Sequence, residues 1–243
     1  MQKIIKKEIS LNNYPYLEEN LAEINAGIAE VCQSIGRDPK AITLVAVTKT
    51  VDEDIVNRSI ELGVTDIGEN KPQEIVRKHP QITGAVNWHM IGHLQSNKVK
   101  KIIDKVTLIH SVDRTSVVDE IEKRAAQIDR VVDILVQVNI GDEEQKSGAD
   151  VEGVKALLKY IEQCPHIRVL GLMCIAPYLY DAEQVRPYFK NMKAIFEEIK
   201  RQNYKNSEMK ILSMGMTHDY KVAIEEGATM IRVGTGIYGS RNY

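Results

Sequence analysis

An apolar run that ends on a lysine is the first feature of this sequence that could do chemistry. The segment ITLVAVTKT, residues 42–50, is apolar on both faces that a strand would present, and Lys49 follows its apolar part directly. A lysine at the end of a buried strand can simply extend its amine to water. It can also be kept as a buried, nucleophilic amine that attacks an aldehyde. The groups that surround Lys49 in space must decide between these two alternatives.

Two glycine-rich segments near the C-terminus have the composition of phosphate-binding loops. SMGMTHD contains Ser213, Gly215 and Thr217, and RVGTGIYG contains Gly234 and Thr235. Glycines let backbone N–H groups approach an anion, hydroxyls donate further hydrogen bonds, and Thr217 is a suitable N-cap for a following helix. We therefore expect the two loops to hold a phosphate. The alternative is that the glycines only satisfy tight turns.

The second loop also matches the pattern GxGxxG, which is found in dinucleotide-binding proteins. That motif should open a βαβ unit and be followed about 20 residues later by an acidic residue. Only residues 240–243 follow GTGIYG. We therefore reject a dinucleotide site.

An arginine in the last apolar segment, TMIRVG, could act together with Lys49. Period-two alternation gives Arg232 and Lys49 defined faces on their segments, and in a closed barrel the first and last strands are neighbours. If both faces point inward, the two cations flank one cavity, where a like charge and partial burial would favour the neutral amine. The alternative is that Arg232 pairs with a carboxylate such as Asp66 or Glu69 and that Lys49 extends to water.

Other residues with chemical potential are weaker candidates. His89 and His93 have i,i+4 spacing in WHMIGH, but no glutamate lies between them and Gly92 argues against a helix, so we expect no zinc site and a wall position for His89. Cys174 is expected to be a small buried residue. The basic segment 98–105 is expected to be a solvated helix face, with weak potential to contact a phosphate or a protein.

The elements that must position these groups alternate regularly along the chain. Eight segments have the character of strands: residues 42–49, 65–70, 88–92, 107–113, 132–139, 168–174, 210–215 and 229–234. Helical patterns separate them, at residues 52–62, 71–78, 95–105, 114–128, 151–162, 181–203 and 218–226, and an amphipathic helix that ends at Gly36 precedes the first. This is the rhythm of an α/β protein of the (β/α)8 barrel class, which places functional groups at the C-terminal ends of its strands. A doubly wound open sheet is the alternative.

Length and composition indicate an ordinary globular protein. The chain has 243 residues, 43% of them hydrophobic and 27% charged, and we expect one domain over residues 1–243. The net charge of -2 gives no reason to expect a nucleic acid or an anionic membrane as partner. Three dispersed cysteines and the absence of a leader or membrane-spanning run predict a cytoplasmic protein. No strongly apolar exposed segment stands out, which predicts a monomer.

Together, the motifs resemble those of the pyridoxal phosphate homeostasis protein family. The resemblance rests on AVTKT, GEN followed by QE, WHMIGHLQSNKVKKI, HSVD, GLMCIAP, SMGMTHD and IRVGTGIYG, from about residue 20 to the C-terminus. It implies an alanine racemase-like (β/α)8 barrel that holds pyridoxal 5'-phosphate (PLP), without the C-terminal β domain of the racemases. By this resemblance Lys49 forms a Schiff base with PLP and Arg232 faces its pyridine nitrogen. The phosphate would be held by Ser213, Gly215, Gly234 and Thr235, and the ring pocket would be lined by Asn70 and Met214.

Two positions depart from the pattern of that family. Pro72 stands where the family usually has another residue, and Thr217 stands where a serine is usual. Neither change removes a needed group, because proline fits the first turn of a helix and threonine keeps the hydroxyl.

Three functions are compatible with these residues. The first is a protein that binds PLP and takes part in vitamin B6 homeostasis by buffering the cofactor or delivering it to apo-enzymes. The second is a PLP-dependent, racemase-like enzyme, and the third is a cofactor-free Schiff-base aldolase that uses Lys49. An arginine opposite the pyridine nitrogen weakens PLP as an electron sink, and no second catalytic base is identified, although Tyr238 or Tyr243 could in principle supply one. We therefore expect a binding protein rather than an enzyme.

Overall fold

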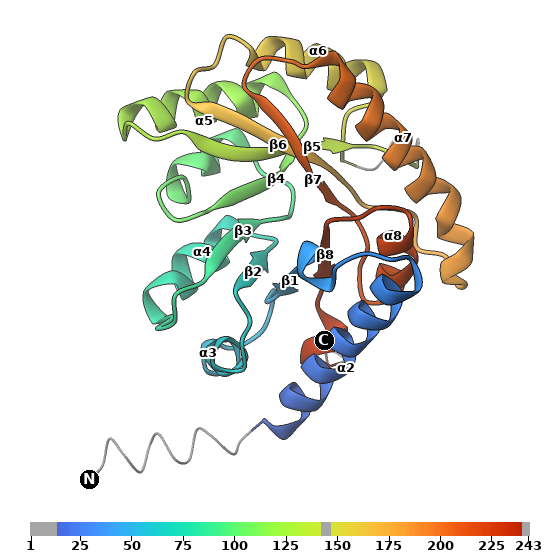
Figure 1. Ribbon diagram of the computed structural model, residues 1–243. Helices are drawn as coiled ribbons and strands as arrows, with labels where there is room; N and C mark the ends of the chain where they lie inside the picture. The colour runs from blue at the N-terminus through green and yellow to red at the C-terminus, as the bar shows by residue number, and fades with distance from the viewer. Residues whose placement is uncertain (1–13, 142–146, 240–243) are drawn as a thin grey trace.

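The computed structural model describes residues 14–141 and 147–239, and within them eight parallel strands close into a barrel (Figure 1). The sheet order is β1-β2-β3-β4-β5-β6-β7-β8, with β8 pairing back onto β1. All eight expected strand segments are confirmed, and the open-sheet alternative is wrong. The strands are β1 (Thr43–Val47), β2 (Asp66–Glu69), β3 (Asn87–Met90), β4 (Leu108–Val112), β5 (Val132–Val138), β6 (Ile167–Cys174), β7 (Ser207–Ser213) and β8 (Met230–Val233).

Helices surround the barrel and follow the expected order with small differences. The α-helices are α2 (Pro15–Ser34), α3 (Glu53–Glu61), α4 (Pro72–Lys78), α5 (Thr115–Gln127), α6 (Val151–Ile161), α7 (Arg186–Gln202), α8 (Tyr220–Glu225) and α9 (Thr235–Tyr238). Short 3-10 helices occur at η1 (Pro39–Ala41), η2 (His79–Gln81), η3 (Ser96–Lys101) and η4 (Ala182–Val185). None of the described helices combines the length and the apolar character needed to cross a membrane.

Three helix predictions require correction or addition. The segment 95–105 forms a 3-10 helix only over 96–101 rather than a longer α-helix, and the helix predicted from residue 218 begins at Tyr220. The short helix α9 was not predicted. Pro72 occupies the first turn of α4, as expected, because its missing N–H is not needed there.

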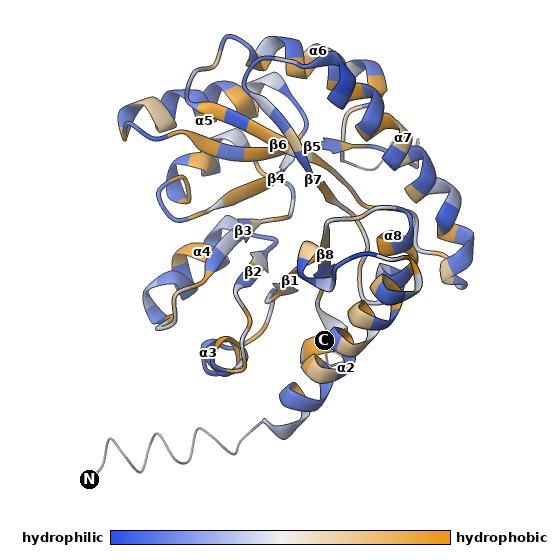
Figure 2. Ribbon diagram, viewed as in Figure 1, coloured by the Kyte–Doolittle hydropathy of each residue, from blue (hydrophilic) through white to orange (hydrophobic). Residues whose placement is uncertain are grey.

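The apolar residues form two separate layers around the sheet. A large outer layer fills the space between strands and helices, where the apolar stripes of the helices face the barrel (Figure 2). A small inner cluster fills the barrel itself and consists of Val45, Leu108, Leu135, Met173 and Met230. Side chains alternate between these layers along each strand, so that every second residue of β1 or β8 points into the barrel.

The register between β1 and β8 decides which polar side chains share the interior. Val45 pairs with Arg232, and Thr43 pairs with Met230. Since Val45 and Met230 both belong to the inner cluster, Arg232 points into the barrel. The expectation that Arg232 and the face of β1 that leads to Lys49 both point inward is therefore confirmed.

The first helix of the described residues, α2, closes the ring of helices at the point where the barrel itself closes. α2 packs against α8 and α9, next to the C-terminal end of the described chain (Figure 1). After α2, the Arg37 guanidinium donates to the carbonyl oxygens of Ile224 and Ala228 at 2.8 and 2.9 Å. The N-terminal segment thus ties the β7–β8 connection to β1.

An irregularity in the barrel wall depends on a glycine in β6. The pairing of β6 shifts register beside Gly171, toward both β5 and β7. A Cβ atom built on Gly171 would overlap the carbonyl oxygen of Ile211 on β7. Backbone therefore approaches backbone here more closely than any other residue type allows.

We predict that Gly171→Ala destabilises the fold by about 3 kcal/mol, because the new methyl group must push β6 and β7 apart. Gly36→Ala is the matched control, since Gly36 also has a positive φ of 67° but has no atom within 4 Å of the added Cβ. That change should cost only about 1 kcal/mol. Urea denaturation of both variants measures the difference, and equal losses of stability would contradict the role given to Gly171.

Candidate functional site

Lys49 lies at the C-terminal mouth of the barrel, directly after β1, and is half-buried. The backbone around it is held firmly: the Thr48 amide donates to Gly68 O and the Val51 amide donates to Thr48 O, both at 3.0 Å. Thr50 adopts a φ of 62°, which is uncommon for a residue other than glycine. Among the described residues, none forms a hydrogen bond or an ion pair with the Lys49 amine. The amine is thus held at the mouth without a protein partner there.

A buried ion pair on the outer side of the barrel wall fixes the backbone that carries Lys49. The side chains of Glu69 and Lys78 are completely buried, and Lys78 Nζ lies 2.7 Å from Glu69 Oε1. Lys78 Nζ also donates to Thr48 O at 2.7 Å, and Thr48 Oγ1 donates to Glu69 Oε1 at 2.7 Å. Glu69 of β2 and Lys78 of α4 therefore fix the position of Thr48, the residue before Lys49, through hydrogen bonds with its hydroxyl and its carbonyl oxygen.

The role of Lys78 was not predicted from the sequence, although a signal was present. Lys78 lies three residues after Ile75 on the buried face of α4, and a lysine on such a face needs a buried partner. The second carboxylate oxygen of Glu69 is buried without a hydrogen-bond partner among the described residues. Lys78 is thus the countercharge of Glu69, and Thr48 Oγ1 donates a further hydrogen bond to the same carboxylate oxygen.

Arg232 is buried inside the barrel and is held by neutral groups. Its guanidinium donates to Ser213 Oγ at 2.6 Å and to the carbonyl oxygen of Cys174 at 2.7 Å. Burial lowers the pKa of Arg232 from its usual value, and the nearby Cys174 and Asp219 partly oppose that shift. The alternative that Arg232 pairs with Asp66 or Glu69 is wrong, because Asp66 bonds to His89 and Glu69 bonds to Lys78.

Ser213 connects Arg232 to two histidines that line the interior. Ser213 Oγ lies 3.2 Å from His110 Nδ1, and His110 Nε2 lies 2.9 Å from His89 Nδ1. The prediction that His89 is a hydrogen-bonded wall residue is confirmed. His110 was missed, although its spacing of two residues from Leu108 would have placed it inside the barrel. The use of Ser213 as a phosphate ligand stays a prediction, because here its oxygen is fully buried beside Arg232.

The two glycine-rich loops contact each other at the mouth through Thr217. Thr217 Oγ1 accepts hydrogen bonds from the Gly236 amide and from Thr235 Oγ1, each at 3.2 Å. The prediction that Thr217 caps the following helix is wrong, because the N-cap position of α8 is Asp219. The threonine hydroxyl instead joins the loop after β7 to the loop after β8, which brings both predicted phosphate loops to one place.

The glycines of these loops have different structural requirements. Gly215 has a φ of 92°, and a Cβ atom there would lie 2.6 Å from the Cβ of Ala223. A turn and close packing therefore suffice to explain Gly215. Gly234 has a negative φ of -116° and acts as the N-cap of α9, so turn geometry does not require a glycine there. Phosphate binding by Gly215, Gly234 and Thr235 stays a prediction.

Asn70 and Met214 occupy different environments. Asn70 follows β2, is half-buried, and lies so close to Gly92 that a Cβ atom on Gly92 would overlap the Asn70 carbonyl oxygen. Ser111 Oγ donates to Gly92 O at 2.6 Å, which links the ends of β2, β3 and β4. Met214 is buried in the outer apolar layer, so only its backbone faces the mouth. Contact of either residue with a ring stays a prediction.

Other acidic, thiol and phenol groups near the mouth are constrained by burial. Burial raises the pKa of the Cys174 thiol to about 12, which keeps it neutral and confirms its expected character. Burial also raises the pKa of Asp219, whose carboxylate accepts a hydrogen bond from the Met216 amide. The Tyr238 hydroxyl lies 3.0 Å from Ser59 Oγ, and burial raises its pKa above the usual value. Tyr243 lies outside the described residues.

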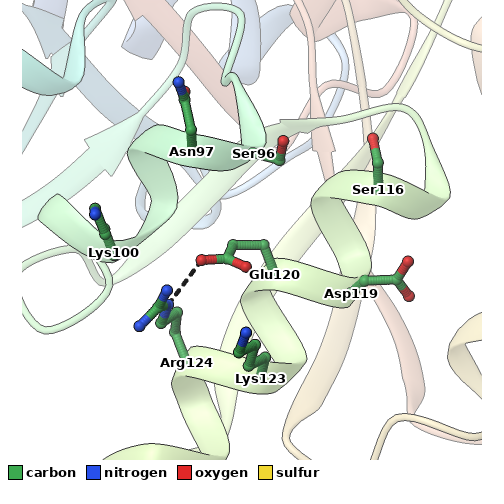
Figure 3. Close-up of a pocket in the computed structure, with 8 residues that line it drawn as sticks. All are labelled: Ser96, Asn97, Lys100, Ser116, Asp119, Glu120, Lys123 and Arg124. Carbon is green, nitrogen blue, oxygen red and sulfur yellow. Dashed lines mark hydrogen bonds and ion pairs between the residues drawn. The ribbon is translucent and has the colours of Figure 1, made fainter.

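A separate hollow of about 530 Å³ lies outside the barrel, between η3 and α5 (Figure 3). It contains both signs of charge, and Arg124 Nε donates to Glu120 Oε1 at 2.7 Å along α5 on one side of it. From the basic segment 98–105 only Lys100 lines it. Its lining residues are Ser96, Asn97, Lys100, Ser116, Asp119, Glu120, Lys123 and Arg124. The opposite charges neutralise each other, so we place the functional site at the barrel mouth instead.

Comparison with known proteins agrees with the fold. Residues 20–242 match the family model for the alanine racemase N-terminal domain. The chain is 42% identical over 226 residues to the pyridoxal phosphate homeostasis protein of Aquifex aeolicus, covering 93% of this chain and 98% of that protein. It is 34% identical over 235 residues to the protein of the same name from Escherichia coli, covering 93% and 97%.

Solved structures show the same barrel. A protein from Bifidobacterium adolescentis superposes with a TM-score of 0.87 at 30% identity, covering 94% of this chain and all of that one. PipY of Synechococcus elongatus, solved with PLP bound, superposes with a TM-score of 0.77 at 31% identity, covering 87% of this chain and all of PipY. The alanine racemase of Corynebacterium glutamicum shares only the fold, at 12% identity and a TM-score of 0.70. The chain therefore belongs to the alanine racemase N-terminal domain family and, within it, to the pyridoxal phosphate homeostasis proteins.

Proposed function

We propose that this protein binds pyridoxal 5'-phosphate at the barrel mouth, covalently through Lys49, and takes part in PLP homeostasis. The observation that carries the proposal is the Lys49 amine, which is held at the mouth on the face that leads into the barrel and has no partner among the described residues. The chemistry of the other donors fits the same molecule. Arg232 offers a cationic donor from the interior, and the loops joined by Thr217 offer hydroxyl and amide donors.

Each group of the protein would have a distinct task when PLP is bound. PLP supplies an aldehyde for covalent attachment and a ring that can act as an electron sink. The Lys49 amine would condense with the aldehyde with loss of one water molecule, and the Glu69–Lys78 pair would hold the backbone of Lys49 in place for that step. Ser213 and the Cys174 carbonyl would keep the guanidinium of Arg232 oriented. Thr235, Gly234 and Gly215 would bind the phosphate, and Asn70 would line the ring.

We propose that the protein holds and supplies PLP rather than catalysing a reaction with it. A buried arginine near the ring would disfavour a protonated pyridine nitrogen and so weaken the electron sink. Tyr238 is engaged with Ser59, which makes it a poor candidate for a second base. The names of the similar proteins from Aquifex aeolicus and Escherichia coli support a role in homeostasis. Apo-enzymes that need PLP are the proposed recipients.

We further propose that the protein works as a cytoplasmic monomer. Its three cysteines are all free thiols, as expected for a reducing compartment. The net charge of -2 supports no nucleic acid or membrane partner.

Lys49→Ala should abolish covalent attachment of PLP, because it removes the amine that we propose to react with the aldehyde. Wild-type protein loaded with PLP should absorb visible light, and borohydride followed by peptide mapping should find the label on Lys49. The variant should bind PLP at least about tenfold more weakly, with residual affinity from the phosphate loops. Lys100→Ala, which removes an exposed lysine from the outer hollow, is the matched control. Labelling elsewhere, or no uptake of PLP by wild type, would refute the proposal.

Lys78→Met should weaken both the fold and PLP binding. The change leaves Glu69 as an unpaired buried charge, which costs about 3–5 kcal/mol, and it removes the donor from the Thr48 carbonyl. Lys193→Met is the control, because the exposed pair of Lys193 with Glu197 should contribute at most about 0.5 kcal/mol.

The double variant Glu69→Gln/Lys78→Met separates stability from positioning. It contains no buried unpaired charge, so urea denaturation should show that it recovers much of the lost stability. It still lacks the donor to Thr48, so its PLP affinity should remain below that of wild type. Wild-type affinity in the double variant would show that the pair stabilises the fold without positioning Lys49.

The protein should not interconvert L- and D-alanine. The expectation rests on the engaged Tyr238 and on Arg232, and it is measured by chiral analysis of alanine incubated with PLP-loaded protein. Lys49→Ala gives the background. Racemisation well above that background would identify the protein as an enzyme, and retro-aldol cleavage of a sugar phosphate without PLP would favour an aldolase.

A further inference from the structure

A continuous chain of hydrogen bonds crosses the interior of the barrel. It runs from Asp66 Oδ1 to His89 Nε2 at 2.9 Å, and from His89 Nδ1 to His110 Nε2 at 2.9 Å. It continues from His110 Nδ1 to Ser213 Oγ at 3.2 Å and ends where Arg232 donates to Ser213 at 2.6 Å. Five side chains from five different strands thus form one connected path.

The path joins the two ends of the barrel. Asp66 is the first residue of β2, and Ser213 is the last residue of β7, beside the mouth. Asp66 lines a hollow of about 310 Å³ at the opposite end of the barrel, together with Thr65 and Lys40. The Asp66 side chain is 12% exposed, whereas both histidines and Ser213 are buried. Asp66 is therefore the most exposed group of the path.

The chemistry of the groups gives this path a direction. A guanidinium can only donate, so Ser213 Oγ accepts from Arg232 and its own hydrogen is available to His110 Nδ1. Burial, followed by the charges of His89 and Arg232, lowers the pKa of His110 well below its usual value, so that His110 is neutral. A neutral His110 that accepts at Nδ1 must donate from Nε2 to His89 Nδ1, and His89 then donates from Nε2 to Asp66.

The carboxylate at the end of the path accepts that last hydrogen. Burial raises the pKa of Asp66, but hydrogen bonds from His89, Thr65 and Asn87 outweigh burial and lower it overall. The lowered pKa favours the ionised carboxylate, and with these histidine tautomers every hydrogen bond of the path points from the mouth toward Asp66.

We propose that this path is a one-proton switch, in which protonation of His89 beside the Asp66 carboxylate reverses the tautomer of His110 and releases the Ser213 hydroxyl at the mouth. The Ser213 hydrogen passes to His110 Nδ1, the His110 Nε2 hydrogen passes to His89 Nδ1, and the one added proton replaces the hydrogen on Ser213 Oγ. His89 then carries hydrogens on both nitrogens and donates from Nδ1 to His110 Nε2, and His110 donates from Nδ1 to Ser213. Ser213 accepts from both His110 and Arg232, and its own hydrogen is free to bind a ligand. The role of that ligand rests on the proposed PLP function.

Three further ionisable groups face the path and must be distinguished from it. The Cys174 thiol and the Asp219 carboxyl lie near Arg232, and Lys49 lies at the mouth. Cys174 stays protonated across the physiological range, since its pKa is about 12. Asp219 is the group whose titration could imitate the switch, because its pKa is raised by burial.

The switch can be tested in the full-length protein without PLP. Long-range 1H–15N spectra of protein labelled with 15N in its six histidines report the tautomer of each ring. At about pH 8, His89 and His110 should both carry their hydrogen on Nε2. As the pH falls, both should change together in one transition. A hydrogen on His110 Nδ1 at about pH 8, or two separate transitions, would overturn the proposal.

Substitutions on the surface of the barrel assign and control these signals. His79, His93, His166 and His218 are not buried, so each can be replaced by Gln to assign the two interior rings by elimination. Asp66→Asn should move the joint transition of His89 and His110 to lower pH. The controls should leave it in place: Glu122→Gln, whose side chain pairs with His166 outside the barrel at 2.7 Å, and Asp219→Asn. A joint histidine transition that moves in Asp219→Asn but not in Asp66→Asn would refute the switch.

A second measurement tests whether the switch reaches the mouth. PLP affinity is titrated by absorbance at about pH 8 and about pH 5.5, and the ratio of the two dissociation constants is compared between wild type and Asp66→Asn. Lowering the pH should strengthen PLP binding by wild type about threefold more than it strengthens binding by Asp66→Asn, because the switch adds one hydrogen bond to the ligand. If wild type and Asp66→Asn have equal ratios while the joint transition of the two histidines occurs as expected, the link between the switch and the PLP site is refuted. An NMR transition in a protein that binds no PLP would refute the proposed function and leave the switch itself supported.

Discussion

The guanidinium of Arg232 inside the barrel is the interaction on which the remaining architecture depends. A buried cation is stable only when hydrogen-bond acceptors surround it, and here these are a serine hydroxyl from β7 and a backbone carbonyl from β6. Neither acceptor carries a charge, so the positive potential of Arg232 remains available at the mouth. The barrel interior must therefore be polar near its C-terminal end and apolar where Val45, Leu108 and Met230 fill it.

The backbone that carries Lys49 is controlled from the other side of the wall. Glu69 and Lys78 lie on the outer side of the barrel wall, where Lys78 donates to the carbonyl of Thr48 and Glu69 accepts from its hydroxyl. Such a buried pair contributes little net stability compared with apolar residues, because both ions lose their hydration. The Glu69–Lys78 pair instead holds the backbone next to Lys49 in place, while the Lys49 amine keeps no partner among the described residues.

The mouth is built from segments that are far apart in sequence. The loop after β1 carries Lys49, the end of β2 carries Asn70, and Thr217 joins the loops after β7 and β8. Because α2 packs over α8 and α9, the N-terminal segment stabilises the closure that brings these loops to β1. A cofactor with an aldehyde, a ring nitrogen and a phosphate would touch all of these segments at once, which is consistent with the proposed function.

The sequence alone predicted the eight strand segments and the barrel class, and it placed Arg232 and Lys49 each on a defined face of its segment. Alternation and period are local properties, so eight apolar segments separated by helical patterns allow few other folds. Lys49 at a strand end and glycines in the last two loops could likewise be recognised from position.

Only the tertiary structure decided the partners of each polar group. Glu69 pairs with Lys78 rather than Arg232, Thr217 joins the second loop rather than capping a helix, and His110 connects Ser213 to His89. These contacts span strands whose heights depend on the stagger of the closed sheet. When only the sequence is considered, several residues of similar type could pair with the same partner. The register of the closed sheet decides which pairs form, because hydrogen bonds and ion pairs need distances of about 3 Å.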